Sequence, residues 1–467
     1  MALVLIGFMG AGKSTLARSL GGVDTDDLLA ERVGESVEAH FDRVGEEAFR
    51  ATEREVIAAA LGSGAEVVAL GGGAVESELD LTGHTVAWLE VQEDVAWERA
   101  AGQARPLARD RAAFADRFTR RAPRYEALAD IHVLPGAVLG DERPGPGERL
   151  VLSPVHPVWV GRAPEPRPGD FLVSDEHVAP LHARGAYPLP AGEEHKTLAT
   201  AERMWTEMAR RGITRSGRVV AVGGGVVGDV AGFCAATYQR GIPVVHVPTT
   251  LVAQVDSAYG GKTGVDLPEA KNYVGAYHQP AAVHVLPGML ATLPAAERAA
   301  GYAEVLKTAL IAGGALWERV RAGAVDDEAT ILACARTKLR IVAADERDAG
   351  LRQVLNLGHT VGHALETAAG YGVLRHGEAV GLGLLAALRL SGQETLREEV
   401  SALLTAQGLP VRVGGVEADA VAELTRRDKK RTGEATPFVL VQAPGRVTPG
   451  HAVQPGDLRA AVQELLA

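Results

Sequence analysis

Residues 7–14 read GFMGAGKS and fit the pattern G-x-x-x-x-G-K-[S/T], which constrains the fold of the surrounding chain more than any other feature. In this pattern backbone N–H groups turn inward around phosphate oxygens, between a strand and the start of a helix. The apolar run ALVLI at 2–6 and the segment STLARSL at 14–20 supply that strand and helix. Lys13 can reach the β- and γ-phosphates, and Ser14 can bind Mg²⁺. The loop therefore predicts an α/β domain that binds a nucleoside triphosphate, without naming the reaction.

A second glycine cluster has a different character. GGGVVGD at 223–229 follows the apolar run RVVAV and contains no lysine. Glycines at such a place let a dinucleotide pyrophosphate approach the backbone, and Asp229 can cap a helix or bind a hydroxyl. An ordinary tight turn is the alternative interpretation, because a bare glycine run is weak evidence by itself.

Whole-chain properties exclude several classes of protein. At 467 residues the chain is long enough for two or three domains with separate cores. Its net charge of −11 argues against nucleic acid as the main partner, and no apolar run approaches the roughly 20 residues of a membrane span. The first apolar stretch runs directly into the phosphate loop, so we expect no signal peptide. Cys234 and Cys334 form no metal or redox motif, which favours a reducing cytoplasm.

The order of apolar runs predicts the domain organisation. Residues 1–135 alternate strand and helix patterns, with strands expected at 66–70 and 85–91 and a helix at 49–61. A Pro/Gly-rich linker is expected at 136–150. Residues 151–293 resume an α/β pattern, and residues 294–467 are mainly helical apart from a strand pair near PFVLVQAPGRV. The predicted fold class is α/β, with a P-loop kinase-type parallel sheet, then a dinucleotide-binding α/β domain, then a mainly helical metal-binding domain.

Charged residues in the first domain indicate phosphoryl transfer. VDTDDLL places Asp24 and Asp26 on alternate residues after a short strand, where one can hold Mg²⁺ through water and the other a substrate hydroxyl. Arg50, the glycines of LGGGAV, Arg105 of ARPLARD and Arg121 of RRAPRYEALAD follow in that order. Each alone has a plain alternative, such as a solvated arginine or a loop glycine. The complete ordered series is difficult to assign to chance.

With these motifs residues 1–135 resemble shikimate kinase. The resemblance implies transfer of the ATP γ-phosphate to the 3-hydroxyl of shikimate, with arginines pairing the substrate carboxylate. It implies shikimate contacts at Asp26, Arg50, Gly72 and Arg121, and ATP contacts at Gly10, Ala11, Gly12, Lys13, Ser14, Thr15 and Arg105. Ser14 would bind the magnesium, and Lys13, Asp26 and Arg105 would take part in catalysis.

Two departures from the kinase pattern concern its activity. The stretch between the phosphate loop and VDTD is several residues shorter than is usual in that family. The lid around Arg105 reads RPLA in place of the usual RPLL. We expect an active kinase, because every chemical residue is present. The alternative is a catalytically weak nucleotide-binding module that regulates the rest of the chain.

The helical region carries a predicted metal site. Glu304 and Lys307 lie three residues apart on one helix face, and His359 and His363 lie four apart on another. RHGE adds His376. One carboxylate and two imidazoles form a zinc set that leaves coordination positions open for substrate. Spacing alone does not decide whether His359 or His363 is the ligand.

The segments GEEHK, GGGVVGDVAGF, VPTTLVAQVDSAYGGKTGVD, AEVLK, RQVLNLGHTVGHALE, RHGE and RRDKK together resemble 3-dehydroquinate synthase over about residues 150–467. The resemblance implies Glu304, His359 and His376 as ligands of Zn²⁺ (or Co²⁺). It implies NAD contacts at Asp175, His177, Glu193, Lys196, Gly224, Gly225, Asp229, Thr249, Thr250, Lys271 and Thr292. It implies substrate contacts at Arg240, Asp256, Lys262, Asn272, Lys307, Lys338, Arg352, Asn356, His363 and a lysine of RRDKK, here assigned to Lys429 with Lys430 as the alternative. Lys262, Lys307 and His363 would take part in catalysis. His177 replaces an expected asparagine, and Arg240 matches an arginine that crosses a dimer interface, which implies a homodimer.

The implied reaction converts 3-deoxy-D-arabino-heptulosonate 7-phosphate to 3-dehydroquinate. Bound NAD oxidises the C5 hydroxyl, phosphate leaves by β-elimination, NADH returns the hydride, and the opened ring closes by an aldol step. Both implied reactions belong to the route from sugar phosphate towards chorismate and aromatic amino acids. A metal- and NAD-dependent alcohol dehydrogenase and a related sugar-phosphate cyclase are the alternatives for this part of the chain.

Overall fold

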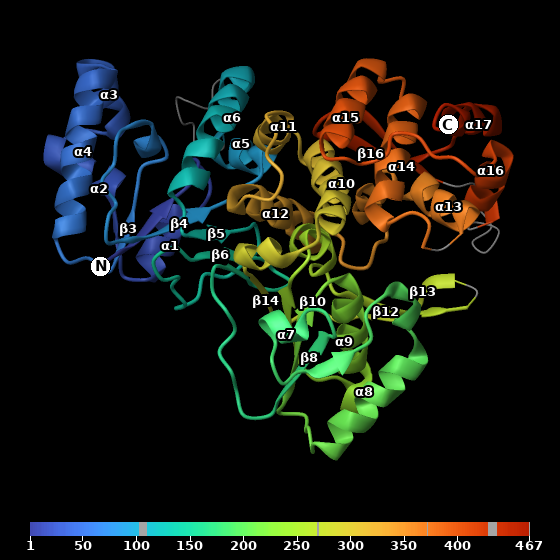
Figure 1. Ribbon diagram of the computed structural model, residues 1–467. Coiled ribbons are helices and arrows are strands. Elements are labelled where there is room, and N and C mark those ends of the chain that lie inside the picture. The colour runs from blue at the N-terminus through green and yellow to red at the C-terminus, as the bar shows by residue number, and fades with distance from the viewer. Residues whose placement is uncertain (102–109, 269, 371, 428–436, 467) are drawn as a thin grey trace. The chain divides into compact units, whose positions relative to one another are not determined.

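The computed structural model describes residues 1–101, 110–268, 270–370, 372–427 and 437–466. The chain divides into two compact units, Met1–Trp159 and Val160–Ala467. Figure 1 shows the first unit in blue to teal and the second in green to red. The division falls later in the chain than the linker expected at 136–150, because residues in and just after that linker still form a strand of the first unit. No helix among the described residues is both long and apolar enough to cross a bilayer.

The first unit is a parallel sheet with strands in the order β2-β3-β1-β4-β5-β6. Its strands are β1 (Leu3–Ile6), β2 (Val23–Asp24), β3 (Val67–Ala69), β4 (Thr85–Leu89), β5 (Ile131–Val133) and β6 (Arg149–Leu152). Its helices are α1 (Lys13–Ser19), α2 (Thr25–Val33), α3 (Val37–Val44), α4 (Glu46–Gly62), α5 (Glu93–Ala101) and α6 (Arg111–Leu128), with the 3₁₀ turn η1 (Ala74–Glu76). The strands expected at 2–6, 66–70 and 85–91 and the helix at 49–61 are confirmed.

Apolar side chains from the central strands and from α6 form the core of the first unit. Val4, Ile6, Val68 and Val86 are buried together with Phe114 of α6. Parallel strands buried in this way have their carboxyl ends at one edge of the sheet. The phosphate loop, Asp24 and the glycines at 71–73 follow β1, β2 and β3 at that edge. The sheet therefore collects the predicted kinase residues.

The second unit contains a parallel sheet and a helical region. The sheet order is β14-β11-β10-β8-β9, with β7 (Val158–Val160) at the division between the units. Its elements are β8 (Asp170–Asp175), α7 (Ala179–His182), β9 (Tyr187–Leu189), η3 (Glu193–His195), α8 (Leu198–Arg210), β10 (Arg218–Gly223), α9 (Gly225–Thr237), η4 (Tyr238–Arg240), β11 (Val244–Pro248), η5 (Ala253–Ser257), β14 (Ala282–Val285) and η6 (Pro287–Thr292). The antiparallel hairpin β12 (Lys262–Leu267) and β13 (Ala270–Tyr277) packs against α9.

The helical region begins with α10 (Ala295–Ala312), as the pattern from residue 294 predicts. It continues with α11 (Gly314–Arg321), α12 (Glu328–Ala344), η7 (Leu351–Asn356), α13 (His359–Ala369), α14 (His376–Leu390), α15 (Glu394–Ala406), α16 (Ala418–Arg427) and α17 (Pro455–Gln463). The predicted strand pair is β15 (Phe438–Ala443) with β16 (Arg446–His451). Helices α13 and α14 approach closely, since a Cβ on Gly383 would lie 1.9 Å from the carbonyl oxygen of Gly358. This contact fixes the start of α13.

Candidate active sites

The phosphate loop of the first unit is shaped around Lys13. The Lys13 ammonium donates hydrogen bonds to the carbonyl oxygens of Gly7 (2.8 Å) and Phe8 (3.3 Å), and the residue is 8% exposed. Gly10 and Gly12 have φ values of 81° and 91°, which L side chains rarely adopt. With Ala11 they form the loop, and Ser14 and Thr15 lie in the first turn of α1. Phosphate oxygens can take over the contacts that Lys13 makes with these carbonyl groups.

The part of this site that is predicted to bind shikimate lies around the glycines at 71–73. A Cβ on Gly71 would lie 2.5 Å from a carboxylate oxygen of Asp26, and one on Gly73 would lie 2.8 Å from Arg50 and 3.2 Å from Arg121. Arg121 also donates to the carbonyl oxygen of Gly72 (3.1 Å). The structure therefore brings Asp26, Arg50, Gly72 and Arg121 together. Asp24 begins α2 by accepting from the Asp26 backbone N–H (2.9 Å), and Arg105 lies outside the described residues.

Two carboxylates in this site were not identified from the sequence. Glu53 of α4 is 4% exposed and accepts from Arg50 at 2.7 Å. Glu76, at the end of η1, contacts Arg50, Arg120 and Arg121. Burial raises the pKa of Glu53, whereas for Glu76 the arginines, chiefly Arg121, outweigh burial and lower the pKa. In the sequence, only the position of Glu53 three residues after Arg50 on one helix could have indicated the contact between them. No sequence feature indicated the contacts of Glu76.

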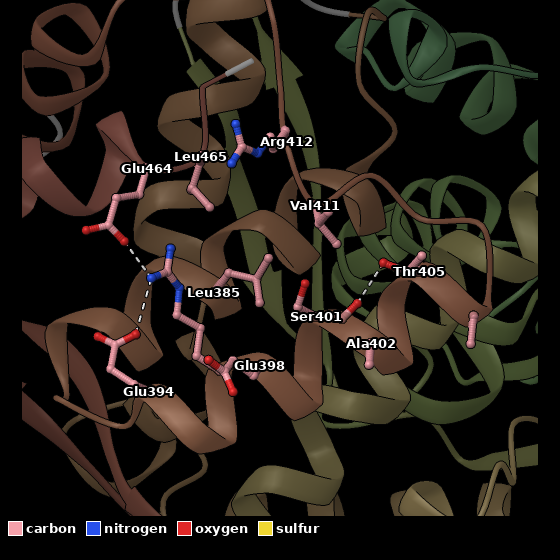
Figure 2. A pocket seen from close by; sticks show the side chains of 12 residues that line it. Leu385, Glu394, Glu398, Ser401, Ala402, Thr405, Val411, Arg412, Glu464 and Leu465 are labelled. Carbon is pink, nitrogen blue, oxygen red and sulfur yellow. Dashed lines mark hydrogen bonds and ion pairs between the residues drawn. The ribbon is translucent and has the colours of Figure 1, made fainter.

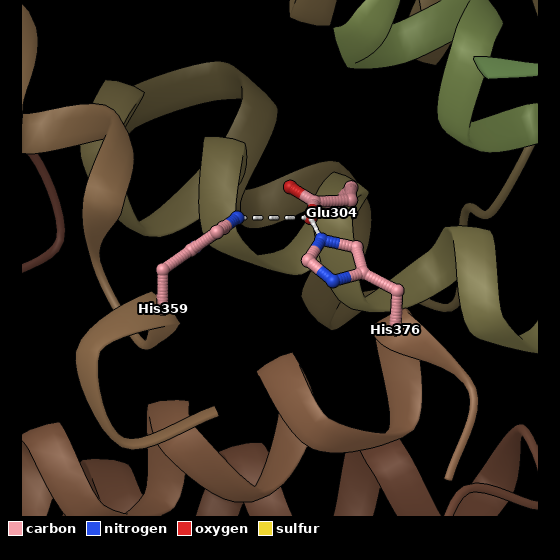
Figure 3. Close-up of side chains that lie close together, drawn as sticks. All are labelled: Glu304, His359 and His376. Carbon is pink, nitrogen blue, oxygen red and sulfur yellow. Dashed lines mark ion pairs between the residues drawn. The ribbon is translucent and has the colours of Figure 1, made fainter. Parts of the chain in front are cut away.

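The predicted metal ligands converge in the second unit (Figure 3). Glu304 of α10 is fully buried, and His359 and His376 are the first residues of α13 and α14. The Nε2 atoms of both histidines lie 3.4 Å from Oε1 of Glu304. His363, one turn along α13, has its ring centre 5.4 Å from that of His359. The structure therefore pairs His359, and not His363, with Glu304.

Hydrogen bonding prepares these groups for a cation. Nδ1 of His359 lies 3.1 Å from the carbonyl oxygen of Leu357, which can only accept. Nδ1 therefore carries a proton, and Nε2, which faces Glu304, is the nitrogen left to bind a metal ion. Oε1 of Glu304, which faces both histidines, has no hydrogen-bond partner among the described residues, whereas Oε2 pairs with the Lys307 ammonium. Partial burial lowers the pKa of His376, but Glu304 and Glu366 outweigh it and raise that pKa to about 10. Two carboxylates that attract positive charge and a correctly oriented imidazole fit a metal ion.

Lysines and carboxylates form a buried network beside this cluster. The Lys307 ammonium lies 2.5 Å from Glu304 and 3.2 Å from Asp256. Lys338 donates to the backbone oxygen of Asp256 (2.7 Å) and also contacts its carboxylate. Asp256 and Glu304 raise the pKa of Lys307 although burial lowers it. Lys307 is therefore protonated at neutral pH and is available to an anionic substrate.

Several further predicted substrate residues have partners that the sequence did not reveal. Lys262 of β12 pairs with Asp348 at 2.5 Å. Arg352 of η7 donates to the carbonyl oxygens of Glu346 (2.5 Å) and Gly260 (2.9 Å). Asn356 ends η7 and is exposed. Lys429 and Lys430 lie outside the described residues, and Arg240 is exposed at the end of η4.

Glu366 adds a second possible donor set. His363, Glu366 and His376 also offer ligand atoms close enough to hold one ion. The Glu366 carboxylate lies 3.6 Å from Nδ1 of His376 and 3.6 Å from the ammonium of Lys271. Carboxylates in such a place commonly orient a ligating imidazole through its other nitrogen. Glu366 was not identified from the sequence.

The predicted dinucleotide residues surround the start of α9. Gly223 ends β10, and Gly224 precedes the first turn of α9. The backbone N–H groups of a first helical turn point away from the helix and can bind a phosphate group. Lys196 pairs with Asp229 at 2.5 Å and also contacts Asn272 and Glu193. A Cβ on Gly224 would lie 2.9 Å from Thr250. This fits a strand-turn-helix loop, as the dinucleotide interpretation requires.

The other residues that are predicted to contact the dinucleotide lie in several elements of the second unit. Asp175 ends β8 and accepts from the backbone of His177 (2.9 Å). Thr249 and Thr250 follow β11, Gly225 starts α9, and Lys271 lies in β13. Thr292 ends η6 and contacts His182 at 2.8 Å.

A separate hollow lies in the helical region (Figure 2). Its volume is about 730 Å³, and α15 and the residues around Val411 and Glu464 line it. The Arg397 guanidinium pairs there with Glu464 at 2.5 Å and with Glu394 at 3.3 Å. No predicted site residue lines this hollow.

Comparison with known proteins identifies the families that the two units match. The family model for shikimate kinase matches residues 9–137. The models for the N-terminal and C-terminal parts of 3-dehydroquinate synthase match residues 186–300 and 301–431. The chain is 48% identical over 297 residues to 3-dehydroquinate synthase of Halorhodospira halophila, covering 59% of this chain and 84% of that protein. It is 41% identical over 324 residues to the synthase of Symbiobacterium thermophilum, covering 63% and 90%.

Solved structures show the same fold for the second unit. The 2-epi-5-epi-valiolone synthase of Streptomyces hygroscopicus, with NAD⁺ and Zn²⁺ bound, has a TM-score of 0.60 and 26% identity, covering 66% of this chain and 96% of its own. A 2-deoxy-scyllo-inosose synthase, complexed with carbaglucose-6-phosphate, NAD⁺ and Co²⁺, has a TM-score of 0.57 and 27% identity, covering 64% and 90%.

Proposed function

The chain belongs to the 3-dehydroquinate synthase family and also carries a shikimate kinase unit, and from this premise we propose how its residues perform two reactions of the shikimate pathway. The first unit transfers the γ-phosphoryl group of ATP to the 3-hydroxyl of shikimate. The second converts 3-deoxy-D-arabino-heptulosonate 7-phosphate to 3-dehydroquinate and phosphate. The observation that supports the proposal is that each unit brings together most of the side chains that its reaction requires, while Arg105, Lys429 and Lys430 lie outside the described residues.

In the kinase, Lys13 neutralises charge on the β- and γ-phosphates, and Ser14 holds Mg²⁺. Asp26 accepts a hydrogen bond from the 3-hydroxyl and aims it at the γ-phosphorus. Arg50 and Arg121 pair with the carboxylate of shikimate. Arg105 completes the nucleotide site. The chain's role is positioning and charge neutralisation, which is what phosphoryl transfer requires.

In the synthase, Glu304, His359 and His376 would hold Zn²⁺ or Co²⁺, and the residues around α9 would hold NAD. When bound, the metal polarises substrate oxygens and the dinucleotide takes up and returns a hydride. The positively charged side chains Lys262, Lys307 and Arg352 hold the anionic groups of the substrate. Asp256 pairs with both Lys307 and Lys338 and keeps them in place. His363 faces the same region from α13 and contacts the substrate.

The alternatives for the second unit differ in their products. The synthases of the two bacterial relatives share 41–48% identity with this chain, whereas the two cyclase structures share 26–27%. This difference favours 3-dehydroquinate as the product. The test is to supply purified protein with heptulosonate phosphate, NAD and Zn²⁺, and separately with shikimate and ATP. Phosphate with 3-dehydroquinate in the first assay, and shikimate 3-phosphate in the second, are the expected products. A cyclitol of different mass in the first assay, or no phosphorylation in the second, would contradict the proposal.

We further propose that the enzyme is a homodimer formed through the second unit. Gln239 and Arg240 have φ values of 50° and 70°, which side chains other than glycine rarely adopt, and this strained turn presents Arg240 to the outside. Sedimentation should give twice the chain mass of 48.8 kDa, and a monomer would contradict the proposal. The buried free thiols of Cys234 and Cys334 are consistent with a reducing cytoplasm.

A further inference from the structure

A carboxylate of the chain itself occupies the arginines of the kinase site. Oε2 of Glu76 contacts Nη2 of Arg121 and lies 3.4 Å from Nη2 of Arg50. Its other oxygen accepts from Nη2 of Arg120 at 3.1 Å. Among these partners Arg121 and Arg50 have side chains 5% and 14% exposed, whereas the Arg120 side chain is 56% exposed.

The two inner arginines are each held by the protein through one nitrogen and present the other to Glu76. Nη1 of Arg50 donates to Glu53 at 2.7 Å, and Nη1 of Arg121 donates to the carbonyl oxygen of Gly72 at 3.1 Å. Both Nη2 groups therefore converge on the same oxygen of Glu76. A substrate carboxylate could bind these Nη2 groups and also the Nε groups of both arginines, which have no hydrogen-bond partner among the described residues. A second carboxylate at this point would either repel Glu76 or replace it.

We propose that Glu76 is an internal competitor for the carboxylate of shikimate and thereby sets the affinity for this substrate. In the empty site Glu76 neutralises Arg50 and Arg121. When shikimate binds, its carboxylate takes their Nη2 groups, and Glu76 stays paired with Arg120 alone. This inference rests on the proposed kinase activity. Neither the family comparison nor the sequence pattern assigns a role to Glu76 or Arg120.

The chain allows this exchange at small cost. Glu76 ends a single 3₁₀ turn, and Ser77 after it has extended backbone, so the side chain is not held by a long helix. Arg120 already pairs with the other oxygen of Glu76, and its exposure gives it freedom to follow. The arginines lower the pKa of Glu76, so it is ionised at neutral pH and competes as an anion.

The test is the substitution Glu76→Gln, which keeps the size of the side chain and removes its charge. Because a neutral hydrogen bond to a guanidinium is about half as strong as a charged one, we expect the Kd and KM for shikimate to fall about fivefold. The gain should appear in KM and not in kcat, and KM for ATP should not move. Glu78→Gln is the matched control, since Glu78 is exposed two residues along the same segment. Thermal unfolding checks that each variant folds, and Glu76→Ala gives a second measurement if the glutamine variant does not.

A second pair of variants tests whether Arg120 acts through Glu76 or contacts shikimate directly. Arg120→Gln removes the outer partner of Glu76, so Glu76 should bind Arg50 and Arg121 more strongly and the KM for shikimate should rise. In the Glu76→Gln background the same Arg120→Gln change should have no effect on KM. A rise that persists in that background would show that Arg120 touches substrate directly and would overturn its proposed role.

The outcomes distinguish this inference from the kinase proposal. If the parent protein phosphorylates shikimate but Glu76→Gln leaves the Kd unchanged or raises it, Glu76 does not compete and the inference fails while the kinase stands. If the parent binds shikimate without turnover, the ratio of the two Kd values still decides the role of Glu76. If neither protein binds shikimate, both proposals fail.

Discussion

Replacing His359 with alanine should remove the metal from the synthase unit, whereas the same change at His363 should leave it bound. His359 presents Nε2 3.4 Å from Glu304, and the centres of the His359 and His376 rings are 5.3 Å apart. The ring of His363 belongs to no donor set that includes Glu304. The two histidines lie one turn apart on α13, so each variant serves as the control for the other.

The expected size of the effect follows from the number of ligands. Structural zinc sites with four protein ligands bind with about 10–16 kcal/mol, or roughly 3 kcal/mol for each ligand. Loss of His359 should therefore weaken metal binding by more than about 100-fold. Loss of His363 should change the affinity by less than about tenfold, which is below the roughly 10–100-fold cost of losing a group that hydrogen-bonds to a metal ligand. His363→Ala should nevertheless lose turnover, because its ring contacts substrate.

The assay is metal content after dialysis against a chelator of known affinity, read together with heptulosonate phosphate turnover. Added Zn²⁺ in excess should partly restore activity to His359→Ala and should not restore His363→Ala. Equal metal loss in the two variants would refute the assignment. It would favour the alternative donor set of His363, Glu366 and His376, which a Glu366→Gln variant would then test.

Three further changes have distinct expected outcomes. Lys13→Ala should abolish shikimate phosphorylation, because the negative charge on the transferred phosphoryl group is then not neutralised. Heptulosonate phosphate turnover should be unchanged. Near-normal kinase turnover would contradict the phosphate-loop assignment. Asp229→Ala breaks the 2.5 Å ion pair with Lys196. The NAD concentration for half-maximal synthase rate should then rise about tenfold or more, while the kinase rate is unchanged. An unaltered NAD requirement would count against this site. Gly377→Ala places a Cβ 1.9 Å from the carbonyl oxygen of Ala300, so α14 must shift at its first turn. Metal binding at His376 should weaken and the free energy of unfolding should fall by about 1–3 kcal/mol, as metal titration and calorimetry would measure. A variant equal to the parent in both measurements would show that the contact relaxes freely.

Local sequence patterns were sufficient for much of the fold. The strands at 2–6, 66–70 and 85–91, the helix at 49–61, the helical region from residue 294 and the late strand pair are confirmed, because each depends on periodicity or on glycine and proline nearby. Strands β5 and β6 were not predicted, and β6 shows why most clearly. Its residues follow a segment rich in proline and glycine, and its existence depends on pairing with β5, which no local pattern encodes.

The candidate sites were predictable to a similar degree. Motif residues such as Lys13, Asp26 and Glu304 lie where the sequence places them, since short motifs fix their own local geometry. The sequence could not choose between His359 and His363, which share one helix face, and that choice depends on where α10 approaches α13. Glu76 and Asp348 were missed because their partners lie far away in the chain, Glu76 reaching Arg121 and Asp348 reaching Lys262.

The central claim for the second unit is that its hydride transfer is reversed within each turnover. The decisive measurement is the ratio of NADH accumulated to phosphate released, followed together with heptulosonate phosphate and trace NAD. Lys262, Lys307 and Arg352 provide positive charge that would keep the anionic intermediate in place until the hydride returns, so many phosphates should be released for each NAD, with no lasting rise in absorbance near about 340 nm. A ratio close to zero is expected. A ratio close to one would contradict it and would identify the second unit as a dehydrogenase.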